Sequence, residues 1–149
     1  MPQKISQQKR HSPDAKLKLD YYYGRQGERN SFYAVPKALC EEMDFMGLSN
    51  DAKLLYAVLL DRNARSLKSN EENGTFLDQC NRTFIYFSIE AIMRKLGCAE
   101  QKAVKLMREL ENYGLIEKRR QGLGKNNIIY VKDIFTLRRF IDPNAEPEL

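Results

Sequence analysis

Polar side chains between residues 101 and 112 are spaced so that they share one face of a helix. They recur at intervals of four, three and four residues, which aligns them along one side of an α-helix. Long donors in such a row suit base edges and phosphates, because Arg and Lys pair with guanine, and Asn and Gln with adenine. The row is Gln101, Lys105, Arg108 and Asn112, with Lys102 beside it. Taken alone, such a row is more often only the solvated side of a helix.

The row needs a helix to hold it, and the flanking sequence predicts one over residues 99–113. Its opposite face carries a single apolar stripe, and Gly114 ends the helix. A shorter helix over residues 89–96 precedes it, with Ser88 as N-cap and Gly97 as stop. A turn of about three residues joins the two, which predicts a helix-turn-helix. The shorter helix adds two supporting cations, Arg94 and Lys95.

A β-hairpin is predicted immediately after this motif. The strand-like runs over residues 115–120 and 128–132 flank the tip QGLGKNN. Glycines there let the backbone approach a phosphate strand or a minor groove. The expected contact residues of this wing are Lys118, Arg119, Arg120, Gly122, Gly124 and Lys125. A nucleotide-binding loop is not indicated, because the third glycine of GxGxxG and the GK[ST] ending are absent.

Together these elements predict a mostly α (α+β) fold, a winged helix-turn-helix with a small antiparallel sheet. Ahead of it we expect a helix from Pro36 to Gly47, and a second over residues 52–67 with Ser49 as N-cap. Residues 69–81 have loop composition, and residues 83–87 that of a strand. Residues 135–141 are expected to form a last amphipathic segment.

The charge is concentrated in the segment that contains these motifs. The 149 residues carry a net charge of +5, and residues 94–139 contribute 12 basic and 5 acidic side chains. This balance favours a polyanionic partner, with double-stranded DNA the first candidate. No apolar run is long enough to span a bilayer and the N-terminus lacks a signal-peptide pattern, so we expect a cytoplasmic protein without membrane association.

Catalysis and metal binding have little support in the sequence. Cys40, Cys80 and Cys98 are too far apart for a metal knuckle, and we interpret them as reduced thiols. The single histidine, His11, lies in a polar N-terminal stretch. We therefore expect no enzyme activity, no catalytic residue, no metal and no cofactor.

The domain boundaries follow from composition. Residues 1–31 are polar and basic and are expected to form a flexible or dimerising arm, in which residues 21–23 could be a short strand or a disordered aromatic segment. The DNA-binding domain is placed at residues 32–141, and residues 142–149 are interpreted as a linker. Linked half-sites would favour a homodimer. Its expected contact is Leu17, Leu19, Tyr21 to Tyr23 and the apolar side of residues 32–39.

Four segments resemble the N-terminal domain of the replication initiator protein A (RepA) family of plasmids from low-GC Gram-positive bacteria. They are FYAVPKALC, GLSNDAKLLYAVLLDR, FIYFSIEAIMRKLGC and AVKLMRELENYGLIEKRRQGLGKNNIIYVKD, and they span most of residues 32–133. The resemblance implies an initiator that binds repeated sites at a plasmid origin, typically as a dimer. It also implies that host replication proteins are recruited through a separate C-terminal domain. Ala99 and Lys102 replace the Ser and Thr of the family pattern, which implies a weaker cap on the second helix.

Two other functions use the same residues. A winged-helix transcriptional repressor would present the same face to a different target and would add an effector pocket. A basic protein-interaction module would attract an acidic partner without discriminating among DNA sequences.

Overall fold

The computed structural model describes residues 12–24 and 31–137. The chain divides into two units, Met1–Ser31 and Phe32–Leu149, and each is described by itself. Residues 12–24 of the first unit contain no helix or strand, so the short strand considered for residues 21–23 is absent. Tyr21 and Tyr23 meet edge to face with ring centroids 6.4 Å apart. The predicted linker at 142–149 and the end of the predicted segment 135–141 lie outside the described residues.

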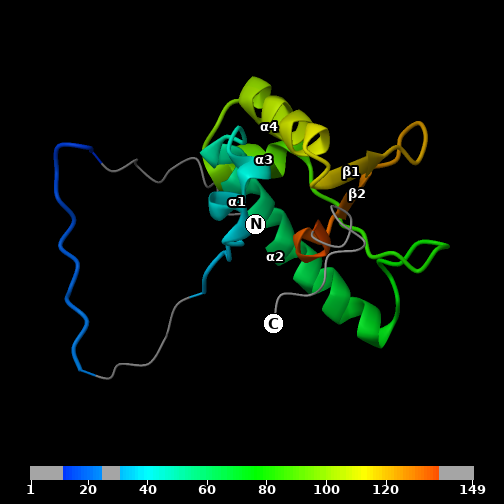
Figure 1. Cartoon of the computed structure of the whole chain (residues 1–149), viewed down its shortest axis with the longest axis horizontal. Helices are drawn as coiled ribbons and strands as arrows, with labels where there is room; N and C mark the ends of the chain where they lie inside the picture. Colours follow the sequence, from blue (N-terminus) through cyan, green and yellow to red (C-terminus); the bar gives the residue numbers. More distant parts are fainter. Residues whose placement is uncertain (1–11, 25–30, 138–149) are drawn as a thin grey trace, which may run out of the picture. The chain divides into compact units, whose positions relative to one another are not determined.

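Helix α2 (Asn50–Glu72) is the central helix of the second unit (Figure 1). The Ser49 hydroxyl accepts a hydrogen bond from the Ala52 N–H and caps the helix as predicted. Leu55, Tyr56 and Leu59 are fully buried in the main core. The Tyr56 hydroxyl donates to the Lys132 carbonyl at 2.6 Å, and burial raises the pKa of Tyr56 to about 12.

The α2 helix continues past the predicted end at Leu67, so the loop expected from Ser69 begins later than its composition indicated. The reason is a long-range contact made by Asn70. Its amide donates to the Phe76 carbonyl at 3.2 Å, and its side-chain oxygen accepts the Phe76 N–H at 2.8 Å. These bonds attach the last helical turn to the following loop, which offsets the weak helix propensity of the segment.

The prediction of a single helix from Pro36 to Gly47 is also wrong, because the structure has two short helices there. The structure has α1 (Ala38–Glu41), an extended residue at Glu42 (φ −81°, ψ 137°) and the 3-10 helix η2 (Met43–Phe45). In one continuous helix, Leu39 and Phe45 would point about 120° apart. The break lets both be buried in the main core and leaves Met43 exposed.

Helices α3 (Ile89–Leu96) and α4 (Glu100–Asn112) form the predicted helix-turn-helix. Ser88 caps α3 by accepting the Ala91 N–H, and Gly97 ends it in the left-handed conformation (φ 65°). Ala99 gives α4 no side-chain cap bond, as the resemblance implied. Gly47 leaves room for Tyr113, because a Cβ there would stand 2.6 Å from the Tyr113 hydroxyl and would displace the end of that side chain.

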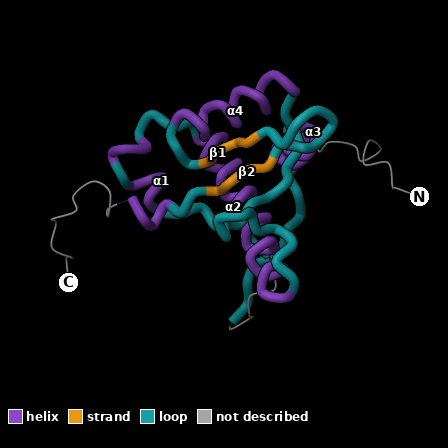
Figure 2. Tube along the Cα trace, turned by 90° about the vertical axis from the view of Figure 1, so that its right-hand side faces the viewer, coloured by secondary structure: helices purple, strands orange, loops and turns teal. Residues whose placement is uncertain are grey.

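Strands β1 (Ile116–Arg119) and β2 (Ile128–Val131) form the predicted antiparallel hairpin, with Ile116 opposite Val131 and Arg119 opposite Ile128. The sheet lies between α4 and α2, with β1 against α4 and β2 against α2 (Figure 2). The strand predicted over residues 83–87 is reduced to isolated bridges, among them Ile85 to Ile129. No longer strand forms from residues 83–87, because the chain enters α3 at its N-cap Ser88. A 3-10 helix, η3 (Ile134–Thr136), follows β2.

Candidate nucleic-acid interface

The predicted polar row lies on the exposed side of α4. Its four members, Gln101, Lys105, Arg108 and Asn112, are all exposed. The opposite side is buried through the stripe Ala103, Leu106, Met107 and Leu110. Since the buried stripe fixes the rotation of the helix, the donors of the row point away from the core.

Lys102 stands apart from that row because it is already paired. Its ammonium lies 2.6 Å from the Asp51 carboxylate in the first turn of α2, and both side chains are about half exposed. The hydrogen bond that Lys102 donates to the Asp51 carboxylate raises the pKa of Lys102. An anion that binds Lys102 therefore competes with this carboxylate.

Glu109 fixes α4 against the start of α2. Its carboxylate accepts the Ser49 N–H at 2.6 Å and the Ser49 hydroxyl at 2.9 Å. Ser49 thus binds both the first turn of its own helix and the second half of α4. This contact sets the position of the exposed face relative to the main core.

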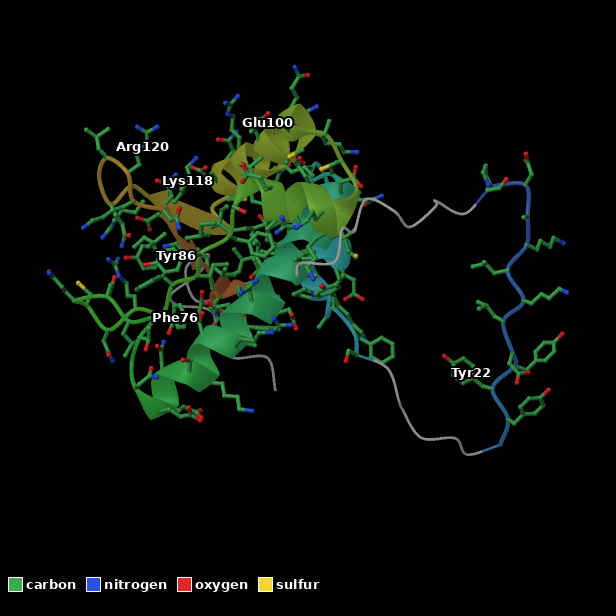
Figure 3. All side chains as sticks on the ribbon, turned by 180° about the vertical axis from the view of Figure 1, so that it is seen from behind. Tyr22, Phe76, Tyr86, Glu100, Lys118 and Arg120 are labelled. Carbon is green, nitrogen blue, oxygen red and sulfur yellow. The ribbon has the colours of Figure 1, made fainter. Side chains whose placement is uncertain are left out.

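A groove with a volume of about 580 Å³ runs between α3, α4 and the hairpin. Four of its lining side chains are cationic and one, Glu111, is anionic. Such a lining favours an anionic ligand. The cations are Arg62, Arg94, Arg108 and Lys118, and Figure 3 shows Lys118 between the hairpin and α4. Of the predicted residues, the groove therefore brings together Arg94, Arg108 and Lys118 from three separate elements, and does not include Lys95.

The cations of the hairpin fall into two groups. Within β1, Lys118 pairs with Glu111 at 3.6 Å, and Arg119 pairs with Glu117 at 3.5 Å. Toward the tip, Arg120 and Lys125 are exposed, and their side chains have no ion pair or hydrogen bond to the residues that the structure describes. Figure 3 shows Arg120 on the projecting loop. Gly122 and Gly124 have φ of 122° and 77°, which only glycine adopts readily.

A polar network anchors the base of the hairpin to the loop after α2. The Tyr130 hydroxyl donates to Asp78 at 2.7 Å, and the same carboxylate accepts Arg82 Nε at 2.8 Å. Arg82 and Arg119 lie over the Tyr130 ring at 4.7 and 5.4 Å. Arg119 is therefore engaged in holding the hairpin. The Arg82 N–H bond, with further help from Tyr130 and the Arg82 side chain, holds the pKa of Asp78 far below its usual range.

Sequence reasoning missed several residues of the groove. Arg62 belongs to α2, far away in sequence, and its guanidinium lies 5.6 Å from the centre of the Phe87 ring. Nothing local marks it, since only the packing of α2 brings it to the groove. Asn126 and Asn127 also line the groove, and their place beside Lys125 was a usable signal. The remaining polar or aromatic residues missed are Tyr86, Phe87, Ser88 and Glu111.

Within residues 12–24 and 31–137, no three His, Cys, Asp or Glu side chains are grouped to hold a metal ion. In the same ranges, no helix has both the length and the apolar character needed to cross a membrane.

The helix-turn-helix, the hairpin behind it and the basic groove between them define a winged helix-turn-helix domain. The chain belongs to the family described as replication initiator protein A (RepA) N-terminus, whose model matches residues 31–141. This membership agrees with the resemblance drawn from the sequence.

Similar proteins are known by sequence and by structure. A 41 kDa protein of Lactobacillus helveticus is 28% identical over 123 residues, which cover 82% of this chain and 33% of that protein. The chain thus spans about a third of this relative's length. A solved structure described as an N-terminal domain of a DNA binding protein has a TM-score of 0.61 at 28% identity, and the match covers 87% of this chain and 100% of that one.

Two further solved structures extend the comparison. One is described as a Rep-DNA complex, with a TM-score of 0.61, 29% identity, and coverage of 87% of this chain and 100% of the other. The second is described as an MDR initiator, with a TM-score of 0.56, 27% identity, and coverage of 75% and 90%.

Proposed function

We propose that this chain is the DNA-binding part of a plasmid replication initiator, and that it binds repeated double-stranded sites at a replication origin without catalysing a reaction. The observation that carries the proposal is the cationic groove between α3, α4 and the hairpin. The family membership and the similarity to a Rep-DNA complex support the origin as the target.

The exposed row of α4 is proposed to enter the major groove. A groove about 12 Å wide admits one helix, and the row presents an amide at each end with two cations between them. Within the row, Lys105 and Arg108 have no ion pair in the described part of the chain, so both remain available for guanine edges or phosphates. Lys102 is assigned a weaker part, since Asp51 holds it.

The groove beside α4 is proposed to receive the sugar-phosphate backbone between the major and minor grooves. Arg62, Arg94 and Arg108 would contact phosphates from three different helices. Asn126 and Asn127 add neutral donors on the hairpin side. Arg120 and Lys125 would then meet the next phosphates, with Gly122 and Gly124 allowing a close approach.

The oligomeric state and the further partners are part of the proposal. A homodimer would place two such faces on paired half-sites, which multiplies the affinity without new contacts. Host replication proteins would be recruited by a C-terminal domain outside this chain. We place the protein in the cytoplasm, where the DNA is.

The test uses the gene that encodes the chain, since initiators of this family usually find their origin within their own coding sequence. Labelled duplexes that tile the gene are measured by fluorescence anisotropy against scrambled duplexes, at about 50 mM and about 200 mM salt. We expect tight binding to a few repeat-bearing tiles that persists at the higher salt. Weak, uniform and salt-labile binding would contradict origin recognition, and would favour a regulator with a distant operator or a protein partner.

A further inference from the structure

The tip of the hairpin carries a leucine that the fold does not use. Leu123 is 105% exposed, and it is the only apolar side chain in the connection formed by residues 120–127. The strand residues that follow behave in the opposite way, since Ile128 and Ile129 are buried. Leu123 therefore makes no contribution to the core of the domain.

The backbone around Leu123 forms a narrow projection. The Lys125 N–H donates to the Gly122 carbonyl at 3.3 Å, which closes a tight turn with Leu123 inside it. Gly122 and Gly124 flank the leucine, and nothing lies within 4 Å of where their Cβ atoms would be. The projection is thus one apolar side chain without bulky neighbours, a shape that suits a minor groove about 6 Å wide.

Charge at the tip favours the same ligand. Arg120 and Lys125 stand on either side of the turn, and their charged groups have no partner in the described part of the chain, whereas Lys118 and Arg119 in β1 are paired. Free cations on both sides of an apolar tip match the two phosphate strands that border a minor groove.

We propose that Leu123 is a wedge that enters the minor groove of bound duplex DNA, partly unstacks one base step and kinks the DNA. The inference rests on the proposed function and adds DNA distortion to it. Apolar side chains inserted in this way bend duplexes by roughly 20–90° toward the major groove. Pyrimidine–purine steps such as TA unstack most easily, so the wedge would select them without a hydrogen bond to any base.

The experiment compares the wild type with Leu123→Ala on the gene tile that binds most tightly. Bending is measured by energy transfer between dyes at the duplex ends, and unstacking by 2-aminopurine placed at successive adenines, both at saturating protein. We expect the wild type to bend the duplex and brighten the probe at one step. Leu123→Ala should lose both signals and bind about three- to tenfold more weakly. Its salt dependence should stay unchanged, because no charge is removed.

Three variants serve as controls. Leu67→Ala removes an exposed leucine of α2 and should change nothing. Leu123→Met keeps an apolar side chain at the tip and should restore both signals. Arg120→Ala should weaken binding and flatten the salt dependence, yet leave the bend intact once the DNA is saturated.

The outcomes separate the wedge from the proposed function. If the wild type binds no tile in preference to scrambled DNA, the proposed function fails. If it binds a tile tightly but neither bends it nor brightens the probe, the wedge alone is wrong. Bending by Leu123→Ala equal to that of the wild type would also overturn the wedge.

Discussion

At the scale of single residues, the cations assigned to the proposed interface are of two kinds. Lys102, Lys118 and Arg119 are paired with carboxylates of the same chain. Lys105, Arg108, Arg120 and Lys125 have no such partner in the described ranges. The sequence predicted the side chains of both kinds, but it did not predict the pairing, because the carboxylate that holds Lys102 comes from another helix.

The roles proposed for Lys105 and Arg120 can be separated by substitution. A base contact distinguishes sequences and is worth about 1–3 kcal/mol, whereas a phosphate contact does not. Lys105→Ala should therefore weaken binding to the specific tile far more than to scrambled DNA. Arg120→Ala should weaken both and reduce the salt slope by about one. Anisotropy titrations over a salt series measure both effects.

Lys68→Ala is the control for this pair, because it removes an exposed cation of α2 outside the groove lining. It should leave both affinities unchanged. Arg120→Ala is expected to weaken binding to both kinds of DNA. If Lys105→Ala had the same effect on specific and scrambled DNA as Arg120→Ala, the division of roles would be contradicted.

At the scale of elements, local signals predicted the helix-turn-helix well. Ser88, Gly97 and Gly114 act through backbone groups within a few residues, and the ends of α3 and α4 lie close to where they indicated. The predictions failed where distant contacts decide. The end of α2 depends on the bonds from Asn70 to the following loop, and the break after α1 depends on burial of Phe45.

The hairpin depends on the network around Asp78, which gives its stability a pH dependence. The pKa of this carboxyl is lowered in the folded protein, first by the Arg82 N–H bond. The stabilisation of the folded state by the Asp78 carboxylate is therefore complete at pH values above the ordinary Asp pKa of about 3.9. It is lost as the pH falls below that value toward the folded-state pKa of Asp78. Asp78→Asn should lower the unfolding temperature at pH 7, and the difference from the wild type should shrink below about pH 4.

Thermal unfolding followed by circular dichroism between pH 7 and about pH 2.5 tests this prediction. Asp61→Asn is the matched control, since Asp61 forms only an exposed pair with Arg65 at 3.3 Å. A difference between Asp78→Asn and the wild type that stays constant across this range would contradict the assignment.

At the scale of the whole molecule, the winged-helix fold and the basic character of the interface were predicted from periodicity and charge. The groove itself was not, because Arg62 joins it from a helix whose sequence gives no sign of that role. The homodimer stays a prediction. The aromatic residues assigned to its contact, Tyr21 and Tyr22, are 81% and 86% exposed.

Replacing Tyr21, Tyr22 and Tyr23 together by serine in the full chain tests the dimer contact. Exposed tyrosines often carry much of the energy of an interface, so we expect dimerisation to weaken by about tenfold or more in sedimentation velocity. Phe135→Ser removes an 81% exposed aromatic outside the predicted contact and should leave the sedimentation coefficient unchanged. A dimer that survives the triple substitution would place the contact elsewhere.

The carboxylates paired with interface cations also determine how the domain responds to ionic strength. A phosphate that binds Lys102, Lys118 or Arg119 competes with Asp51, Glu111 or Glu117, and a carboxylate that it displaces would attract a cation from solution. Ion release from the DNA is largely cancelled at these positions. The slope of log affinity against log salt concentration then comes mainly from the unpaired cations. The protein should therefore stay bound to DNA over a wider range of salt concentration than its number of basic residues suggests.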